Sequence, residues 1–199
     1  MQFHNNYLYH IYNRGNNKQK IFFNDDNYIF FLKRIRHFIL PHCDIISYCL
    51  MPNHFHLLVF VSDNSRHQTV SNRQMPEHDQ HPLIRAIASL LSSYTQAINK
   101  QNGSSGSLFQ KKTKAKCLNE GSINYATTCF HYIHQNPYKA ILVKALEDWS
   151  YSSFKDYSSI RNGTLCNKKL AFELLDLNPE NFYEESYKAI DADKIKDIF

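Results

Sequence analysis

The chain is 199 residues long, 43% hydrophobic and 14% aromatic, with a formal net charge of +5. That length and composition suit a globular protein with one substantial core, and the mildly basic charge allows a nucleic-acid partner without establishing one. The five cysteines form no CxxC pair, which argues against a disulfide framework or a structural zinc site and favours a reducing, cytoplasmic location. No apolar run is long enough to span a membrane and no secretion signal is visible, so we expect no membrane partner.

The first third of the chain predicts the order strand, helix, strand, strand. Residues 7–12 (YLYHIY) are rich in aromatic and branched side chains and form the first strand. Asn24 is a suitable N-cap for a helix with an apolar stripe, and Pro41 stops that helix. Two apolar segments, 44–50 and 54–61, flank a tight corner and therefore predict a hairpin.

The remainder of the chain predicts a second helix, a fourth strand and a third helix. Residues 62–81 are polar without periodicity and indicate a long loop. Pro82 opens a helix, residues 108–118 form a strand with a basic face, and a helix from about residue 122 ends at Asn136-Pro137. A loop and one or two short amphipathic helices complete the chain.

This order of elements matches the βαββαβ pattern of a ferredoxin-like fold. We therefore expect an α+β protein with an antiparallel sheet, helices on one face, and the first and third strands in the centre. The other face of the sheet would then be available for a ligand or a further element.

A pair of histidines lies at the start of the third strand. Strand side chains alternate between faces, so His54 and His56 point the same way and Phe55 points the opposite way. Two imidazoles on one face can bind a single divalent ion. The remaining coordination positions of the ion would be open to a third protein ligand and to a substrate. From spacing alone, however, two ordinary solvated histidines are the more probable interpretation.

The third helix carries the residues that could complete such a site. Tyr132 and Asn136 are four residues apart and share one face if the last turn stays helical, although Pro137 makes that turn uncertain. As isolated residues they would more often be a packing aromatic and a helix cap. His131 and His134 compete as metal ligands, but they flank Tyr132 rather than sharing its face, so we rank them lower.

Basic side chains gather in three segments that would suit the phosphates of single-stranded nucleic acid, although each segment alone is usually a solvated face. The candidates for contact with nucleic acid are Arg14, Lys18, Lys33, Arg36, Lys111, Lys112, Lys114 and Lys116. The chain contains no Walker loop, GxSxG elbow, HExxH helix or GxGxxG turn, which removes several common enzyme classes.

Several motifs, taken in order, resemble those of the REP-associated tyrosine transposases, a branch of the single-tyrosine HUH transposases. The segment Leu50–Val59 (LMPNHFHLLV) resembles the signature of this family. Supporting matches are Asn13–Gly15, Gly106–Lys111, Tyr132–Pro137 and Trp149–Phe154. The resemblance covers roughly residues 5–157, and it implies the ferredoxin-like fold already expected from the order of elements.

The resemblance also implies roles for individual residues. His54 and His56 would hold Mg²⁺ or Mn²⁺, and Asn136 would complete the metal site, where related transposases commonly have Gln. Tyr132 would be the nucleophile that cleaves single-stranded, hairpin-containing DNA and forms a 5′-phosphotyrosine link. Among the basic residues, Arg14 and the strand 111–116 would be the best candidates for DNA contact.

The resemblance divides the chain into a catalytic domain, residues 1–157, and a helical C-terminal extension, residues 158–199. A monomer is favoured over a dimer. One alternative function is a catalytically inactive, domesticated module that binds DNA or RNA hairpins, and a weaker one is metal storage by the eleven histidines.

Overall fold

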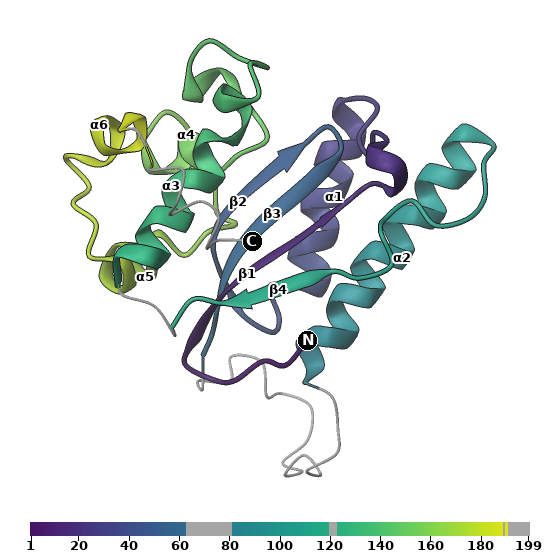
Figure 1. The fold of residues 1–199 in the computed structure, drawn as a ribbon, viewed down its shortest axis with the longest axis horizontal. Helices are drawn as coiled ribbons and strands as arrows, with labels where there is room; N and C mark the ends of the chain where they lie inside the picture. Colours follow the sequence, from purple (N-terminus) through teal and green to yellow (C-terminus); the bar gives the residue numbers. More distant parts are fainter. Residues whose placement is uncertain (63–80, 120–122, 189, 191–199) are drawn as a thin grey trace.

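The computed structural model describes residues 1–62, 81–119, 123–188 and 190, and its centre is a four-stranded antiparallel sheet (Figure 1). The strands are β1 (Tyr7–Arg14), β2 (Asp44–Met51), β3 (His54–Val61) and β4 (Lys114–Cys117). Their order across the sheet is β2-β3-β1-β4, so the first and third strands are central and the expected ferredoxin-like arrangement is confirmed. The histidine-bearing loop predicted between β3 and the next helix falls largely outside the described residues.

The helices divide between the two sides of the sheet. They are α1 (Asp25–Phe38), α2 (Pro82–Asn102), α3 (Ile123–Lys139), α4 (Phe154–Tyr157), α5 (Lys168–Leu175) and α6 (Phe182–Tyr187), with short 3-10 turns η1 (Asn16–Lys18) and η2 (Leu146–Asp148). In Figure 1, α1 and α2 lie together on one side, and α3 to α6 gather on the other beside β2. No helix among the described ranges is long and apolar enough to cross a membrane.

The face of the sheet toward α1 and α2 is an aromatic core. Asn24 caps α1 as predicted, because its side-chain oxygen accepts a hydrogen bond from the backbone N–H of Asn27. Phe31 of α1 then packs against Phe55 of β3, with ring centroids 5.3 Å apart, and both side chains are fully buried. Phe55 is therefore the anchor on the face opposite to the paired histidines.

The other face is covered by α3, which packs mainly against β2 and β3. The predicted end of this helix at Asn136-Pro137 is wrong, since α3 continues to Lys139 with Pro137 inside it. A proline removes only one N–H from the helix ladder, and here the helical bonding continues beyond it, since the Ala140 N–H donates to the Asn136 carbonyl. The last turn therefore keeps Tyr132 and Asn136 on the same face.

The predicted fourth strand is also shorter than expected, covering residues 114–117 rather than 108–118. The Asn13 side chain explains part of the difference, because its amide donates to the Gln110 carbonyl and to the Thr113 hydroxyl. These bonds hold residues 108–113 beside the end of β1 without a regular ladder.

The strand β2 lies at the edge of the sheet, and residues 149–154 run along that edge and cover it. This cover protects the edge from pairing with other chains. The Leu50 N–H donates to the Tyr151 carbonyl, and the Trp149 indole donates to the Leu50 carbonyl. Ser153 links this segment both to β2 and to α3, because its hydroxyl lies 2.7 Å from Nε2 of His134. The short helices α5 and α6 then pack on the outer surface of α3.

Candidate active site

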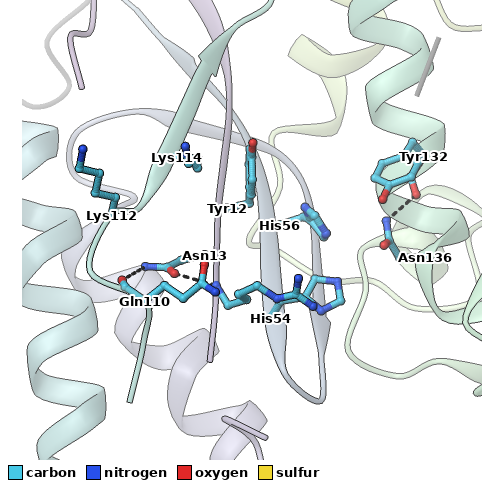
Figure 2. Close-up of a pocket in the computed structure, with 10 residues that line it drawn as sticks. Tyr12, Asn13, His54, His56, Gln110, Lys112, Lys114, Tyr132 and Asn136 are labelled. Carbon is cyan, nitrogen blue, oxygen red and sulfur yellow. Dashed lines mark hydrogen bonds between the residues drawn. The ribbon is translucent and has the colours of Figure 1, made fainter. Parts of the chain in front are cut away.

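A cavity of about 360 Å³ lies between the sheet and α3, and it contains the residues singled out from the sequence (Figure 2). Its lining residues are Tyr12, Asn13, Arg14, His54, His56, Gln110, Lys112, Lys114, Tyr132 and Asn136. None of these ten residues is acidic, and three of them are cations. The cavity therefore suits a negatively charged ligand such as a phosphodiester.

The two histidines of β3 lie side by side on the face that looks toward α3. Their ring centroids are 5.0 Å apart, and Nδ1 of His54 lies 2.6 Å from the side-chain oxygen of Asn53. Burial, and then the charge of Arg14, lowers the pKa of His54 to about 4. Burial also lowers the pKa of His56 well below its usual range. Both imidazoles are therefore neutral near pH 7, the form in which a ring nitrogen can bind a metal.

Tyr132 and Asn136 face the histidines from α3, as Figure 2 shows. The ring centroids of Tyr132 and His56 are 6.0 Å apart. The Asn136 amide donates to the Tyr132 carbonyl at 2.8 Å, one helical turn back. Burial raises the pKa of the Tyr132 hydroxyl to about 12, while hydrogen bonding to Asn136 lowers it, and Asn136 also interacts with His54. Asn136 thus connects the tyrosine with the histidine pair within one chain.

The chemistry of these donors fits a divalent ion in an open site. Two neutral imidazoles and one amide oxygen are an acceptable partial shell for Mn²⁺, and the amide oxygen suits Mg²⁺. In the part of the chain that the structure describes, no cluster of three or more His, Cys, Asp or Glu side chains could hold a metal. A complete shell at this cavity would therefore need Asn136 and non-protein oxygens beside the two histidines.

The structure brings only some of the predicted basic residues to this cavity. Arg14, Lys112 and Lys114 line it. Lys111 lines a second, larger cavity of about 900 Å³ between α2 and residues 106–114, which shares Gln110, Lys112 and Lys114 with the first. The two cavities are therefore neighbours at the β4 edge.

The other predicted basic residues lie elsewhere. Lys116 of β4 points its ammonium at the Tyr125 ring, 5.6 Å from the centroid, and Lys18 is exposed in η1. Lys33 and Arg36 are exposed on α1 and line a separate small cavity beside Arg161. Nothing in the geometry joins Lys33 or Arg36 to the histidines and Tyr132.

His131 and His134, the lower-ranked metal candidates, do not line the cavity. His131 packs toward α6, with Nδ1 3.1 Å from the Ser186 hydroxyl. His134 is fully buried and contacts Ser153. Both histidines attach neighbouring segments to the back of α3, which fixes the direction in which Tyr132 points.

Among the side chains of the site that were not predicted from the sequence are His10 and Tyr12 of β1. Tyr12 pairs with His56 in the strand register, and Nε2 of His10 lies 2.8 Å from Nδ1 of His56. Side chains alternate along the first strand, so His10, Tyr12 and Arg14 share one face. This alternation was the only sign in the sequence that His10 and Tyr12 could lie near Arg14. What the sequence lacked was the pairing of β1 with β3, which brings that face to the histidine pair.

Three motifs far apart in the sequence meet at one end of the sheet. Gly15 N–H donates to the Asn53 carbonyl, and Gln110 N–H donates to the Arg14 carbonyl. A side chain at Gly15 would collide with the backbone oxygen of Gln19, so only glycine fits this position. These bonds hold Arg14 and His54 at the mouth of the cavity.

Comparisons with known proteins agree with this fold and these motifs. No protein-family model matches the chain. A protein of Haemophilus influenzae named as a REP-associated tyrosine transposase is 26% identical over an alignment of 120 residues that covers 56% of this chain. The matched region spans only 58% of the length of that curated relative.

A solved structure shares the fold. It is a REP-associated tyrosine transposase bound to a REP hairpin, with a TM-score of 0.55 and 16% identity, covering 81% of this chain and 84% of that one. A bacterial tRNA(His) guanylyltransferase-like protein in complex with GTP reaches a TM-score of only 0.42 at 9% identity, which is too low to carry an argument.

The chain therefore shares the α+β fold of that solved transposase structure. Its resemblance to the REP-associated tyrosine transposases, expected from the motifs, is confirmed.

Proposed function

We propose that this protein is a metal-dependent transposase of the single-tyrosine HUH kind, which cleaves and rejoins single-stranded DNA that contains hairpins. The observation that carries the proposal is the placement of Tyr132 across the cavity from His54 and His56, with Asn136 beside it on the same helix face. The curated relative is named as a transposase, and the solved relative was bound to a hairpin.

The proposed reaction is a transesterification at one phosphodiester. The Tyr132 hydroxyl oxygen attacks phosphorus and the bond from phosphorus to the 3′ oxygen breaks, which leaves a 5′-phosphotyrosine and a free 3′-OH. The tyrosine proton leaves to solvent, since none of the described residues that line the cavity is a carboxylate that could accept it, and the departing 3′ oxygen takes up a proton from solvent. The number of phosphoester bonds is unchanged, so a 3′-OH can reverse the step without an external energy source.

A divalent ion held by His54, His56 and Asn136 would supply positive charge at the scissile phosphate. The low pKa values of both histidines keep their rings available for that role at neutral pH. The pKa of Tyr132, raised to about 12 by burial, means that the free hydroxyl is a weak nucleophile at pH 7. Positive charge next to the hydroxyl is therefore needed before the tyrosine can attack.

Cations and two neighbouring cavities support DNA as the substrate. Arg14, Lys112 and Lys114 surround the proposed reaction centre, and the second cavity lies next to it along α2, with no acidic residue among the described residues that line it. A single strand that leaves the active site would follow the second cavity, where Lys111 and the amides and hydroxyls of α2 can contact phosphates. We further propose that the protein acts as a monomer, because Tyr132 faces the histidines of its own chain.

We also propose that the protein is located in the cytoplasm. This location agrees with the five cysteines, which are all free thiols.

The proposal is tested by incubating the purified protein with an end-labelled hairpin oligonucleotide that has single-stranded flanks, in Mn²⁺ or Mg²⁺. We expect a covalent protein–DNA adduct that disappears with EDTA and in Tyr132→Phe. Tyr12→Phe is the matched control, since Tyr12 lines the same cavity and should leave adduct formation largely intact. Tight, salt-sensitive hairpin binding without any adduct would instead identify an inactive hairpin-binding module.

A further inference from the structure

His10 is a buried polar side chain that the proposed reaction does not otherwise use. It lies in β1 with 0% of its surface exposed. Its Nε2 is 2.8 Å from Nδ1 of His56, and the two rings are nearly parallel, with centroids 5.0 Å apart and an interplanar angle of 23°. Buried polar side chains carry an energetic cost that such hydrogen bonds offset, so the contact constrains both rings.

The sheet geometry holds His10 in this position. Tyr12 is opposite His56 in the register of β1 and β3, which makes His10 the diagonal neighbour of His56 on the same face. The Tyr12 ring also stacks on His10, with centroids 4.7 Å apart. Little rotation of the His10 ring is possible in this packing.

We propose that His10 is a positioning residue that orients His56 and selects its tautomer. In this arrangement the Nδ1–H of His56 donates to Nε2 of His10, and the ring of His56 presents the lone pair of its own Nε2 to the divalent ion. The opposite arrangement, with His10 as donor, would place the proton of neutral His56 on Nε2 and leave that nitrogen unable to bind the ion. The inference rests on the proposed function, because it takes His56 to be a metal ligand.

His54 is held in a corresponding way. Its Nδ1 lies 2.6 Å from the Asn53 side-chain oxygen, which can only accept a hydrogen bond, so His54 is the donor. The Asn53 amide in turn donates to the Lys18 carbonyl, which fixes which end of that side chain is the oxygen. Metal-binding histidines commonly donate their second N–H to a neighbouring group that orients the ring. Asn53 and His10 would have this role for the two histidines of the pair.

The test measures the affinity of the full chain for Mn²⁺ without DNA, by electron paramagnetic resonance of the free ion. His10→Phe keeps an aromatic ring but no acceptor, and it should weaken Mn²⁺ binding about 10- to 100-fold. His10→Gln restores an acceptor near the position of Nε2 and should recover most of the affinity. Ile11→Val, a fully buried change on the opposite face of the same strand, should leave the affinity unchanged.

Two results separate this inference from the proposed function. Wild-type Mn²⁺ affinity in His10→Phe, together with lost binding in His56→Ala, would overturn the role of His10 and leave the metal site standing. Unchanged binding in His56→Ala would overturn the metal site, and the inference with it. If His10→Phe fails to fold, ¹⁵N NMR of the wild-type protein decides, because a His56 ring protonated on Nε2 rather than Nδ1 contradicts the proposal.

Discussion

The stability of the protein at mildly acidic pH should depend on His131, which holds α6 against the back of α3. The side chain is 7% exposed, and its Nδ1 lies 3.1 Å from the Ser186 hydroxyl. Burial, and then the charge of Lys188, lowers the pKa of His131 to about 4. In the unfolded chain the pKa returns to about 6.5. Folding therefore favours the neutral ring.

The sign and size of the effect follow from these two pKa values. Below about pH 6.5 the unfolded chain binds a proton that the folded protein excludes, so stability falls as the pH decreases toward 4 and is constant above that window. The loss from this one residue is about 2 kcal/mol at pH 5 and about 3 kcal/mol at pH 4. Whole domains are stable by only about 5–15 kcal/mol, so the effect is measurable.

The assay is urea unfolding of the wild type and of His131→Asn at pH 7 and pH 5. The asparagine keeps an amide near the position of Nδ1 but does not titrate. Between pH 7 and pH 5 the free energy of unfolding of the variant should therefore fall by about 2 kcal/mol less than that of the wild type. Other histidines are common to both proteins, and the lowered pKa of His134 is caused first by burial, which the variant keeps, and only then by His131, so their contributions largely cancel in the comparison. Equal losses in the two proteins would refute the assignment of this pKa to the buried contact with α6.

Three further predictions concern the core and the cavity. Phe55→Ala should lower the free energy of unfolding by about 3–5 kcal/mol in urea, because the ring is fully buried against Phe31; a loss below about 1 kcal/mol would contradict the described packing. Lys114→Ala should reduce the slope of log affinity for hairpin DNA against log salt by about 0.7–0.9, whereas Lys33→Ala, on the other side of the sheet, should not; equal effects would argue against this cavity as the DNA site. Asn136→Ala should slow adduct formation at least about tenfold at subsaturating Mn²⁺, and wild-type rates would exclude Asn136 from the metal site.

Most of the fold follows from local patterns in the sequence. The cap at Asn24, the alternation of Phe55 with the two histidines in β3 and the proline that opens α2 each act through neighbouring residues, and the structure confirms all three. The predicted end of α3 failed for a different reason. A proline usually disfavours helix in the residue before it, but here packing of α3 on β2 and β3 outweighs that preference.

The candidate site was predictable only in part. His54 and Tyr132 carry recognisable motifs, whereas His10 shows its importance only after β1 pairs with β3, and that contact spans 46 residues. In the same way, Lys33 and Lys114 look equivalent as basic residues in the sequence. The topology separates them, because α1 and the cavity lie on opposite faces of the sheet.

The central claim is that Tyr132 becomes covalently attached to DNA, and mass spectrometry of the trapped adduct tests it most directly. The protein is incubated with a hairpin oligonucleotide and Mn²⁺, digested with nuclease and trypsin, and searched for peptides that carry a nucleotide. The account predicts a 5′-phosphonucleotide on the peptide containing Tyr132 and none on the peptide containing Tyr12. A nucleotide on Tyr12, or an adduct that persists undiminished in Tyr132→Phe, would contradict it.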